Sequence, residues 1–290
     1  MSRPAPLRWP NGAKIAILPQ LILEDWIGGH GGAKMLPKVP EEAIKAGAVD
    51  YAAAAWAAYG ASKGAWRIFR LFRKYGIPAT GIFSGLAVEK QAEFSRAWVD
   101  AGNEIAAHSY AQNIRIFTLS PEAERENVRK CVDVISSVTG YRAVGWNCPG
   151  GQRSERTTGI LLDEGIYYSY DYKDDDRPHT AEIVGGEKMV AVPKLFDVND
   201  MTTYAAASHP PSSYVEIFCR SFDVLYGEEQ AHGGKMLSLS AHAALYGRPM
   251  GASALEECIR YAKSFPGVWF ATGRDVADFW LTQCSGVASY

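Results

Sequence analysis

Residues that can transfer protons directly follow several apolar runs of this sequence. Glu24 and Asp25 follow a long apolar run, and His108 and His242 each follow a shorter one. Packing explains a carboxylate pair at such a place poorly, because charged side chains are rarely buried without a partner. We therefore take Glu24, Asp25, His108 and His242 as the candidate catalytic residues, with general acid and base chemistry as their expected role.

Spacing leaves open which of the two acids is the base. Neighbouring residues at the end of an extended strand point in opposite directions, so only one of Glu24 and Asp25 can face a common pocket if the strand continues through them. Two adjacent acids in a partly desolvated place are expected to raise the pKa of one carboxyl group toward neutrality. Such a carboxylate would accept a proton from an attacking water.

A metal site is the alternative use of these residues. Catalytic zinc is usually held by three His or carboxylate ligands, and His108, His242 and either Glu24 or Asp25 supply them on paper. The more specific pattern, a second histidine four residues after His108, is absent, because Gln112 is a poor zinc ligand. We expect no metal cofactor, with zinc held through His108 and Glu24 or Asp25 as the alternative.

Amide and aromatic side chains stand near the same points of the sequence. Amides can hydrogen-bond the carbonyl groups of a small molecule, and tryptophans offer flat faces to a planar ring. The candidate substrate-binding residues are Trp26, Gln112, Trp146, Asn147, Asn199 and Asp200.

Predicted strands alternate with predicted helices along nearly the whole chain. The strands are expected at residues 13–23, 78–83, 103–109, 142–146, 166–172, 189–195, 235–242 and 268–271, and residues 173–180 are expected to form a polar loop. Seven or eight such alternations indicate parallel βαβ units and a closed or nearly closed β/α barrel. Active sites of such barrels lie at the carboxyl ends of the strands, where the candidate residues stand.

Length and composition indicate one large domain. We expect residues 1–290 to form a single domain with an N-terminal extension and a long loop at about 26–49. The 30 basic and 32 acidic residues nearly cancel and form no basic stripe, so nucleic acid is not an expected partner.

The cysteines and the apolar runs of the sequence predict the cellular compartment of the protein. Five widely spaced cysteines without a CxxC pair fit a reducing environment better than a disulfide framework. The sequence shows neither a signal peptide nor an apolar run of the roughly 18 residues needed to span a bilayer. We expect a cytoplasmic protein that binds a small molecule and no membrane.

Five stretches together resemble the successive motifs of the polysaccharide deacetylase superfamily. They are "WPNGAKIAILPQLILEDW", "EIAAHSYAQN", "GYRAVGWNCPGGQRSERTTGILLDEGIYYSYDYKDDDRP", "VPKLFDVNDM" and "LSAHAALYGRP" with the later "VWFATGRDVADFW". Within the superfamily the sequence is most similar to the cytoplasmic branch of metal-independent allantoinases and related cyclic imide hydrolases. The resemblance implies an α/β fold, a distorted (β/α)7 barrel, commonly assembled as a homotetramer.

Departures from the metal-dependent members bear on the chemistry. Those members have aspartates where this chain has Ile22 and Leu23, a second histidine in place of Gln112, and an arginine near Asn147. Only His108 remains of the usual metal ligands. The resemblance therefore implies catalysis without a metal.

The expected function is that of a hydrolase acting on a C–N bond of a small cyclic amide, ureide or imide, by metal-independent acid–base catalysis. Three alternatives remain open. The first is a metal-dependent deacetylase of an N-acetylated substrate, and the second is a metal-independent lyase, decarboxylase or C–C hydrolase on the same barrel. The third is a non-catalytic binding protein.

Overall fold

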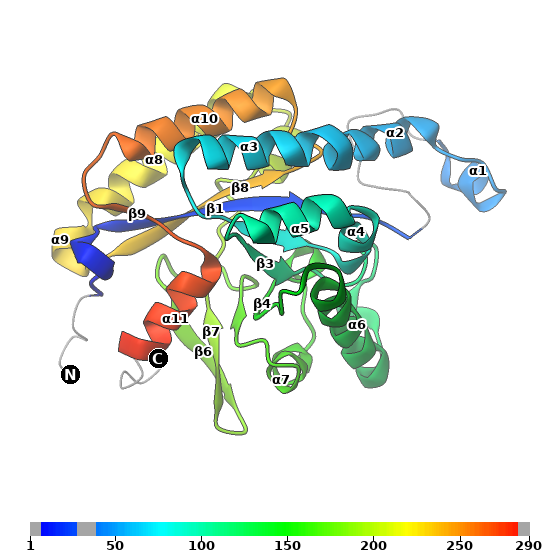
Figure 1. Cartoon of the computed structure of the whole chain (residues 1–290), viewed down its shortest axis with the longest axis horizontal. Coiled ribbons are helices and arrows are strands. Elements are labelled where there is room, and N and C mark those ends of the chain that lie inside the picture. Colours follow the sequence, from blue (N-terminus) through cyan, green and yellow to red (C-terminus); the bar gives the residue numbers. More distant parts are fainter. Residues whose placement is uncertain (1–6, 28–38, 284–290) are drawn as a thin grey trace.

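The strands of the protein form one curled sheet with helices on its outside (Figure 1). The computed structural model describes residues 7–27 and 39–283. Within them the strands are β1 Ile15–Leu23, β2 Thr80–Phe83, β3 Glu104–Ala107, β4 Gly145–Trp146, β5 Tyr168–Ser169, β6 His179–Val184, β7 Glu187–Ala191, β8 Lys235–His242 and β9 Val268–Phe270. Their order is β6-β7-β5-β4-β3-β2-β1-β8, and β9 also pairs with β1.

This arrangement confirms the predicted distorted barrel. Every paired strand runs parallel to its neighbour except β6, which is antiparallel to β7. The order begins at β6 and ends at β8, so the sheet curls into an open, half-barrel form. The carboxyl ends of the parallel strands lie along one rim, as βαβ connections require.

One strand was not predicted. Residues 173–180 were expected to form a loop, yet β6 begins at His179 and forms a hairpin with β7. The turn is Gly185–Gly186, with φ of 61° and 90°, values that glycine adopts at little cost. A Gly-Gly pair between two β-prone segments is a hairpin signal that is visible in the sequence.

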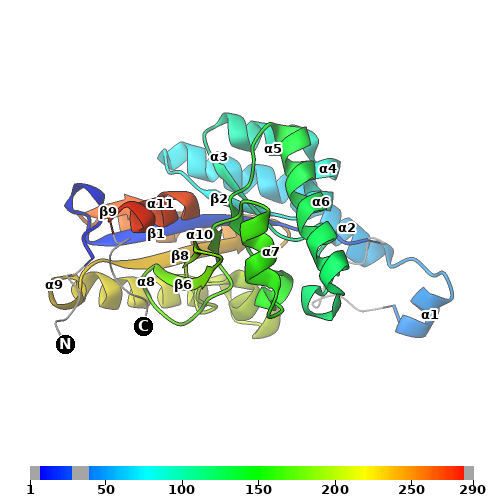
Figure 2. The same ribbon diagram turned by 90° about the horizontal axis from the view of Figure 1, so that it is seen from below.

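Helices cover the outer face of the sheet (Figures 1 and 2). They are α1 Glu41–Lys45, α2 Tyr51–Tyr59, α3 Ala65–Tyr75, α4 Gly85–Lys90, α5 Ala92–Asp100, α6 Pro121–Thr139, α7 Thr157–Asp163, α8 Pro211–Gly227, α9 Glu229–His232, α10 Pro249–Lys263 and α11 Gly273–Gln283. The predicted helix after Ser120 is α6, and the Ser120 hydroxyl accepts a hydrogen bond from the Ala123 N–H at its start. No helix in the described part of the chain is long and apolar enough to cross a bilayer.

The helices α1 and α2 extend away from the barrel (Figures 1 and 2). A π-helical turn, Gly60–Gly64, joins α2 to α3. The loop expected at about 26–49 lies partly outside the described residues, and α1 occupies part of the remainder. A short helix therefore lies within this stretch, and residues 46–49 after it are not helical.

Side chains along β1 alternate between two cores. Ile15, Ile17, Leu21 and Leu23 belong to the core shared with the outer helices. Ala16, Leu18 and Ile22 belong to the core inside the barrel, with Tyr168 and Tyr170. This two-residue period decides which polar side chains at the strand ends point inward.

Candidate active site

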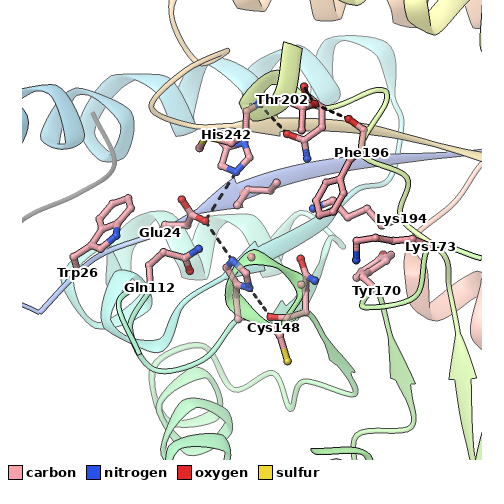
Figure 3. Close-up of a pocket in the computed structure, with 17 residues that line it drawn as sticks. Glu24, Trp26, Gln112, Cys148, Tyr170, Lys173, Lys194, Phe196, Thr202 and His242 are labelled. Atoms are coloured by element: carbon pink, nitrogen blue, oxygen red, sulfur yellow. Dashed lines mark hydrogen bonds and ion pairs between the residues drawn. The ribbon is translucent and has the colours of Figure 1, made fainter. Parts of the chain in front are cut away.

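A cavity of ≈ 270 Å³ opens at the carboxyl ends of the strands (Figure 3). Ile22 and Glu24 come from the end of β1, His108 follows β3, and His242 ends β8. The predicted site residues Glu24, Trp26, His108, Gln112, Asn147, Asn199 and His242 line the cavity, and Asp25, Trp146 and Asp200 do not. Ends of non-adjacent chain segments thus meet in one pocket, as the barrel requires.

The Glu24 carboxylate lies between two histidines (Figure 3). Its Oε1 is 3.3 Å from His108 Nε2 and 3.9 Å from His242 Nε2. The side chains of all three are largely buried, at 10% exposure for Glu24, 4% for His108 and 10% for His242. Glu24 points inward because it continues the even-numbered, inward side of β1 after Ile22.

A main-chain carbonyl orients His108. The Asn147 oxygen lies 2.5 Å from His108 Nδ1, and a carbonyl can only accept, so Nδ1 carries the hydrogen. This leaves Nε2 facing Glu24, and a hydrogen bond between these two groups needs one further proton on the pair. The pair is therefore arranged to exchange a proton.

Asp200 orients the other histidine. Its Oδ1 accepts from His242 Nδ1 at 2.6 Å, and its Oδ2 accepts from the His242 main-chain N–H at 2.8 Å. Tyr246 donates a further main-chain hydrogen bond to Oδ2. Asp200 is fully buried and does not line the cavity, so the structure corrects its predicted part in substrate contact. It holds His242 with Nε2 toward Glu24.

Electrostatics at this centre differ from the sequence expectation. Burial alone would raise the pKa of Glu24, but the hydrogen bond with His108 and the charges of His242, His108 and Lys194 outweigh it and lower that pKa below 4.5. Burial alone would lower the pKa of His242, but Asp200 and Glu24 outweigh it and raise that pKa above 6.5. Both shifts favour the charged forms, a carboxylate on Glu24 and an imidazolium on His242.

Asp25 points away from the cavity. Its Oδ1 pairs with Lys90 of α4 at 2.9 Å and accepts the Trp26 N–H at 2.7 Å. Its own N–H donates to the Ser84 hydroxyl. The structure thus corrects the prediction that paired acids share the mouth of the pocket, since the two-residue period turns Asp25 outward.

Asp25→Asn is therefore expected to leave turnover within about threefold of the wild type, because an exposed ion pair such as Asp25 with Lys90 contributes little. Steady-state rates at neutral pH would measure this. A loss of two orders of magnitude would return Asp25 to the catalytic centre.

Trp146 is a core residue. It is fully buried among the residues that face the outer helices, and its Nε1 donates to Cys148 Sγ at 3.1 Å. The structure corrects its predicted contact with a substrate ring. Asn147 does line the cavity, but its amide donates to Asp171 Oδ1 at 2.8 Å, which fixes the loop that also orients His108.

Two lysines that the sequence analysis missed also line the cavity, namely Lys173 and Lys194. Lys194 follows β7, where Val190 and Val192 belong to the inner core. The same two-residue period places Lys194 inside. Counting that period to the end of the predicted strand at residues 189–195 would have found it.

The side chains that line the cavity do not match the metal ligands expected in the metal-dependent deacetylases. Ile22 and Gln112 line the cavity in the places where those enzymes are expected to have an aspartate and a histidine. Neither side chain is a good ligand for zinc. Among residues 7–27 and 39–283 no group of three His, Cys, Asp or Glu side chains could hold a metal ion.

Comparisons with known proteins agree on one family. The polysaccharide deacetylase family matches residues 57–169. A putative polysaccharide deacetylase of Schizosaccharomyces pombe is 30% identical over 240 residues, which cover 78% of this chain and 75% of that protein. A peptidoglycan deacetylase of Helicobacter pylori is 23% identical over 289 residues, 89% of this chain and 92% of that protein.

Solved structures are similar over nearly the whole chain. PuuE allantoinase has a TM-score of 0.87 and 30% identity, with 98% of this chain and 95% of that one covered. A probable polysaccharide deacetylase from Pseudomonas aeruginosa has a TM-score of 0.87 and 29% identity, with coverage of 97% and 95%.

Proposed function

Since the chain belongs to the polysaccharide deacetylase family, whose members hydrolyse C–N bonds, we propose that it opens a small cyclic amide, ureide or imide without a metal. The likeness to an allantoinase over 98% of the chain supports a cyclic ureide or a related ring as the substrate. A cavity of ≈ 270 Å³ suits a single ring better than a polymer chain.

One observation carries this proposal. A carboxylate oxygen of Glu24 lies 3.3 Å and 3.9 Å from two histidine nitrogens, while Ile22 and Gln112 replace metal ligands beside them. The centre therefore offers a base and two proton donors in place of a Lewis acid.

The proposed reaction uses each of these groups once. The Glu24 carboxylate takes a proton from water as the water oxygen bonds to the ring carbonyl carbon. Glu24 passes this proton to His108 Nε2, which then donates a hydrogen bond to the oxyanion. His242, held as imidazolium by Asp200, gives its Nε2 proton to the ring nitrogen as the C–N bond breaks. The products are a carboxylic acid and a free nitrogen group.

Two further residues suit recognition of a planar ring. Gln112 lines the cavity, and its buried Oε1 has no hydrogen-bond partner among the described residues. A ring N–H would satisfy this acceptor. Trp26 lines the same cavity and offers an apolar face.

A substrate screen with chelation tests the proposal. We expect at least one hydantoin, dihydropyrimidine or cyclic imide to be opened by the purified protein, at a rate unchanged after treatment with EDTA. Product formation would be followed by chromatography, and metal content by elemental analysis. Readdition of zinc to the treated protein is the control and should not raise the rate.

A metal-dependent deacetylase is the second candidate, since both curated relatives described above are named deacetylases. Stoichiometric metal, loss of activity on chelation and release of acetate from an N-acetylated amine would establish it and refute our proposal. A lyase, decarboxylase or C–C hydrolase would give other products in the same screen. A binding protein would show ligand-induced stabilisation without any product.

Assembly as a cytoplasmic homotetramer stays a proposal. The exposed Tyr51 side chain on the protruding helix α2, together with its alanines, offers a surface for a second copy. Light scattering of the purified protein would measure the mass, and a monomer would exclude this assembly.

A further inference from the structure

A buried lysine faces the cavity without a counter-ion. Lys194 is 5% exposed, and no hydrogen bond or ion pair joins its ammonium group to another residue that the structure describes. In Figure 3 it lies with Lys173 and Phe196 on the side of the cavity away from Trp26. An ammonium group in such a place is costly unless an anion joins it.

Lys173 adds a second ammonium group on the same side. It lies over the Phe196 ring at 4.7 Å and donates to the Asp171 main-chain oxygen at 3.0 Å. A Cβ atom at Gly151 would come within 2.8 Å of its Nζ, so the glycine leaves the room that this ammonium occupies. Only one of its three N–H donors has a hydrogen-bond acceptor among the described residues.

The nearby carboxylates make their hydrogen bonds and ion pairs with other groups than the two lysines, among the residues that the structure describes. Glu24 faces the two histidines, and Asp200 holds His242. Asp171 Oδ1 accepts from the Asn147 amide and from the Cys148 N–H. Asp171 Oδ2 is buried without a hydrogen-bond partner, but no ion pair joins a carboxylate to either ammonium group in the described part of the chain.

Electrostatics agree with this geometry. Burial lowers the pKa of Lys194 to about 8, and the charge of Lys173 adds to the shift. The charges of Glu24, Asp200 and Asp171 oppose it. Burial also lowers the pKa of Lys173, against the opposing charge of Asp171. Both ammonium groups would be stabilised by an anion placed between them.

The geometry points to a substrate whose ring carries a carboxylate, with the scissile bond at Glu24 and the carboxylate on the ammonium groups of Lys194 and Lys173. This inference rests on the proposed ring hydrolysis and adds the charge of the substrate to it. The two ends of the cavity would then fix which ring bond meets Glu24.

A carboxylate fits this end better than a phosphate. Phosphate sites commonly use rows of free main-chain N–H groups. The nearby glycine loop offers no such row, since the Gly151 and Gln152 N–H groups donate to the Cys148 and Pro149 oxygens. With a volume of ≈ 270 Å³ the cavity holds one ring and one small anionic group.

Binding of unreactive rings tests the inference apart from catalysis. The probes are uracil and uracil-6-carboxylate, measured by titration calorimetry at pH 7. We expect the carboxylate to bind about 10- to 100-fold more tightly than uracil, as a charged hydrogen bond would give. In Lys194→Met this preference should disappear, whereas in Lys63→Met, which alters an exposed lysine of the outer π-helical turn, it should stay.

Turnover of a matched pair separates this inference from the proposed function. The substrates are dihydrouracil and dihydrouracil-6-carboxylate, and the expected preference in kcat/KM for the anion is again about 10- to 100-fold. Equal binding of both unreactive rings, or an unchanged preference in Lys194→Met, would overturn the inference even if rings are opened. Tight, Lys194-dependent binding without any ring opening would uphold the anion site and refute the proposed hydrolysis.

Discussion

Replacing Glu24 by Gln is expected to lower kcat by about 10³-fold, the middle of the range for a general base. The amide keeps the shape of the side chain but cannot take a proton from water. It also removes the negative charge that both histidines face at 3.3 Å and 3.9 Å. Initial rates on the best substrate of the screen would measure the loss.

The matched control is Asp25→Asn, which makes the same chemical change at the neighbouring residue. Asp25 pairs with Lys90 outside the cavity, so its variant should keep nearly full activity. Thermal unfolding of both variants would show that neither change disrupts the barrel. Nearly full activity of a folded Glu24→Gln protein would remove Glu24 from the reaction.

Replacing Asp200 by Asn is expected to lower kcat by about 10²-fold and to alter the pH profile, because Asp200 acts through His242. The amide oxygen can still accept from the main-chain N–H groups of His242 and Tyr246, but the amide no longer supplies the charge that favours imidazolium. A merely structural role would lower activity evenly at all pH values. The readout is therefore kcat/KM measured from pH 5 to 9.

The sign of the pH effect follows from the two shifted groups. Activity needs Glu24 ionised, which holds above its lowered pKa, and His242 protonated, which holds below its raised pKa. The wild type should lose activity as pH rises through the His242 pKa, above 6.5. In Asp200→Asn the charge that chiefly opposes the effect of burial on the His242 pKa is gone, so this pKa should fall. The loss of activity at high pH, the alkaline limb of the profile, should therefore move to lower pH.

An unchanged alkaline limb in Asp200→Asn would assign the limb to another group, such as Lys194, whose pKa is about 8. The variant Lys194→Met distinguishes the two, because it keeps Asp200 and His242. If His242 is the acid, the loss of activity at high pH should persist on a neutral substrate and move to higher pH, because the charge of Lys194 lowers the His242 pKa. If Lys194 is the acid, that loss should disappear.

The order of elements could be read from the sequence because local chemistry fixes it. Ser120 begins α6 by capping its first turn, and the apolar run before Glu24 forms the central strand β1. The hairpin of β6 and β7 is equally local, since the Gly185–Gly186 turn between two β-prone segments is visible in the sequence.

The sequence also predicts that side chains alternate between the two faces of a strand, but it does not show which face points into the barrel. Which side of β1 faces inward depends on the curl of the whole sheet, and that curl placed Glu24 in the cavity and Asp25 against Lys90. The same phase buried Trp146 under the helices and turned Lys194 inward. A residue list at the strand ends cannot make this choice.

The pKa values belong to the tertiary structure alone. The sequence places one charged neighbour, Asp25, directly beside Glu24, and two adjacent acids predict a raised pKa for one of them. In the folded chain the neighbours are His108, His242 and Lys194, which come from other segments of the barrel, and the shift is downward. The sequence by itself determined the fold class and most of the residue types at the site. Only the closure of the sheet decided their partners, because electrostatic interactions depend on distance in space and not along the chain.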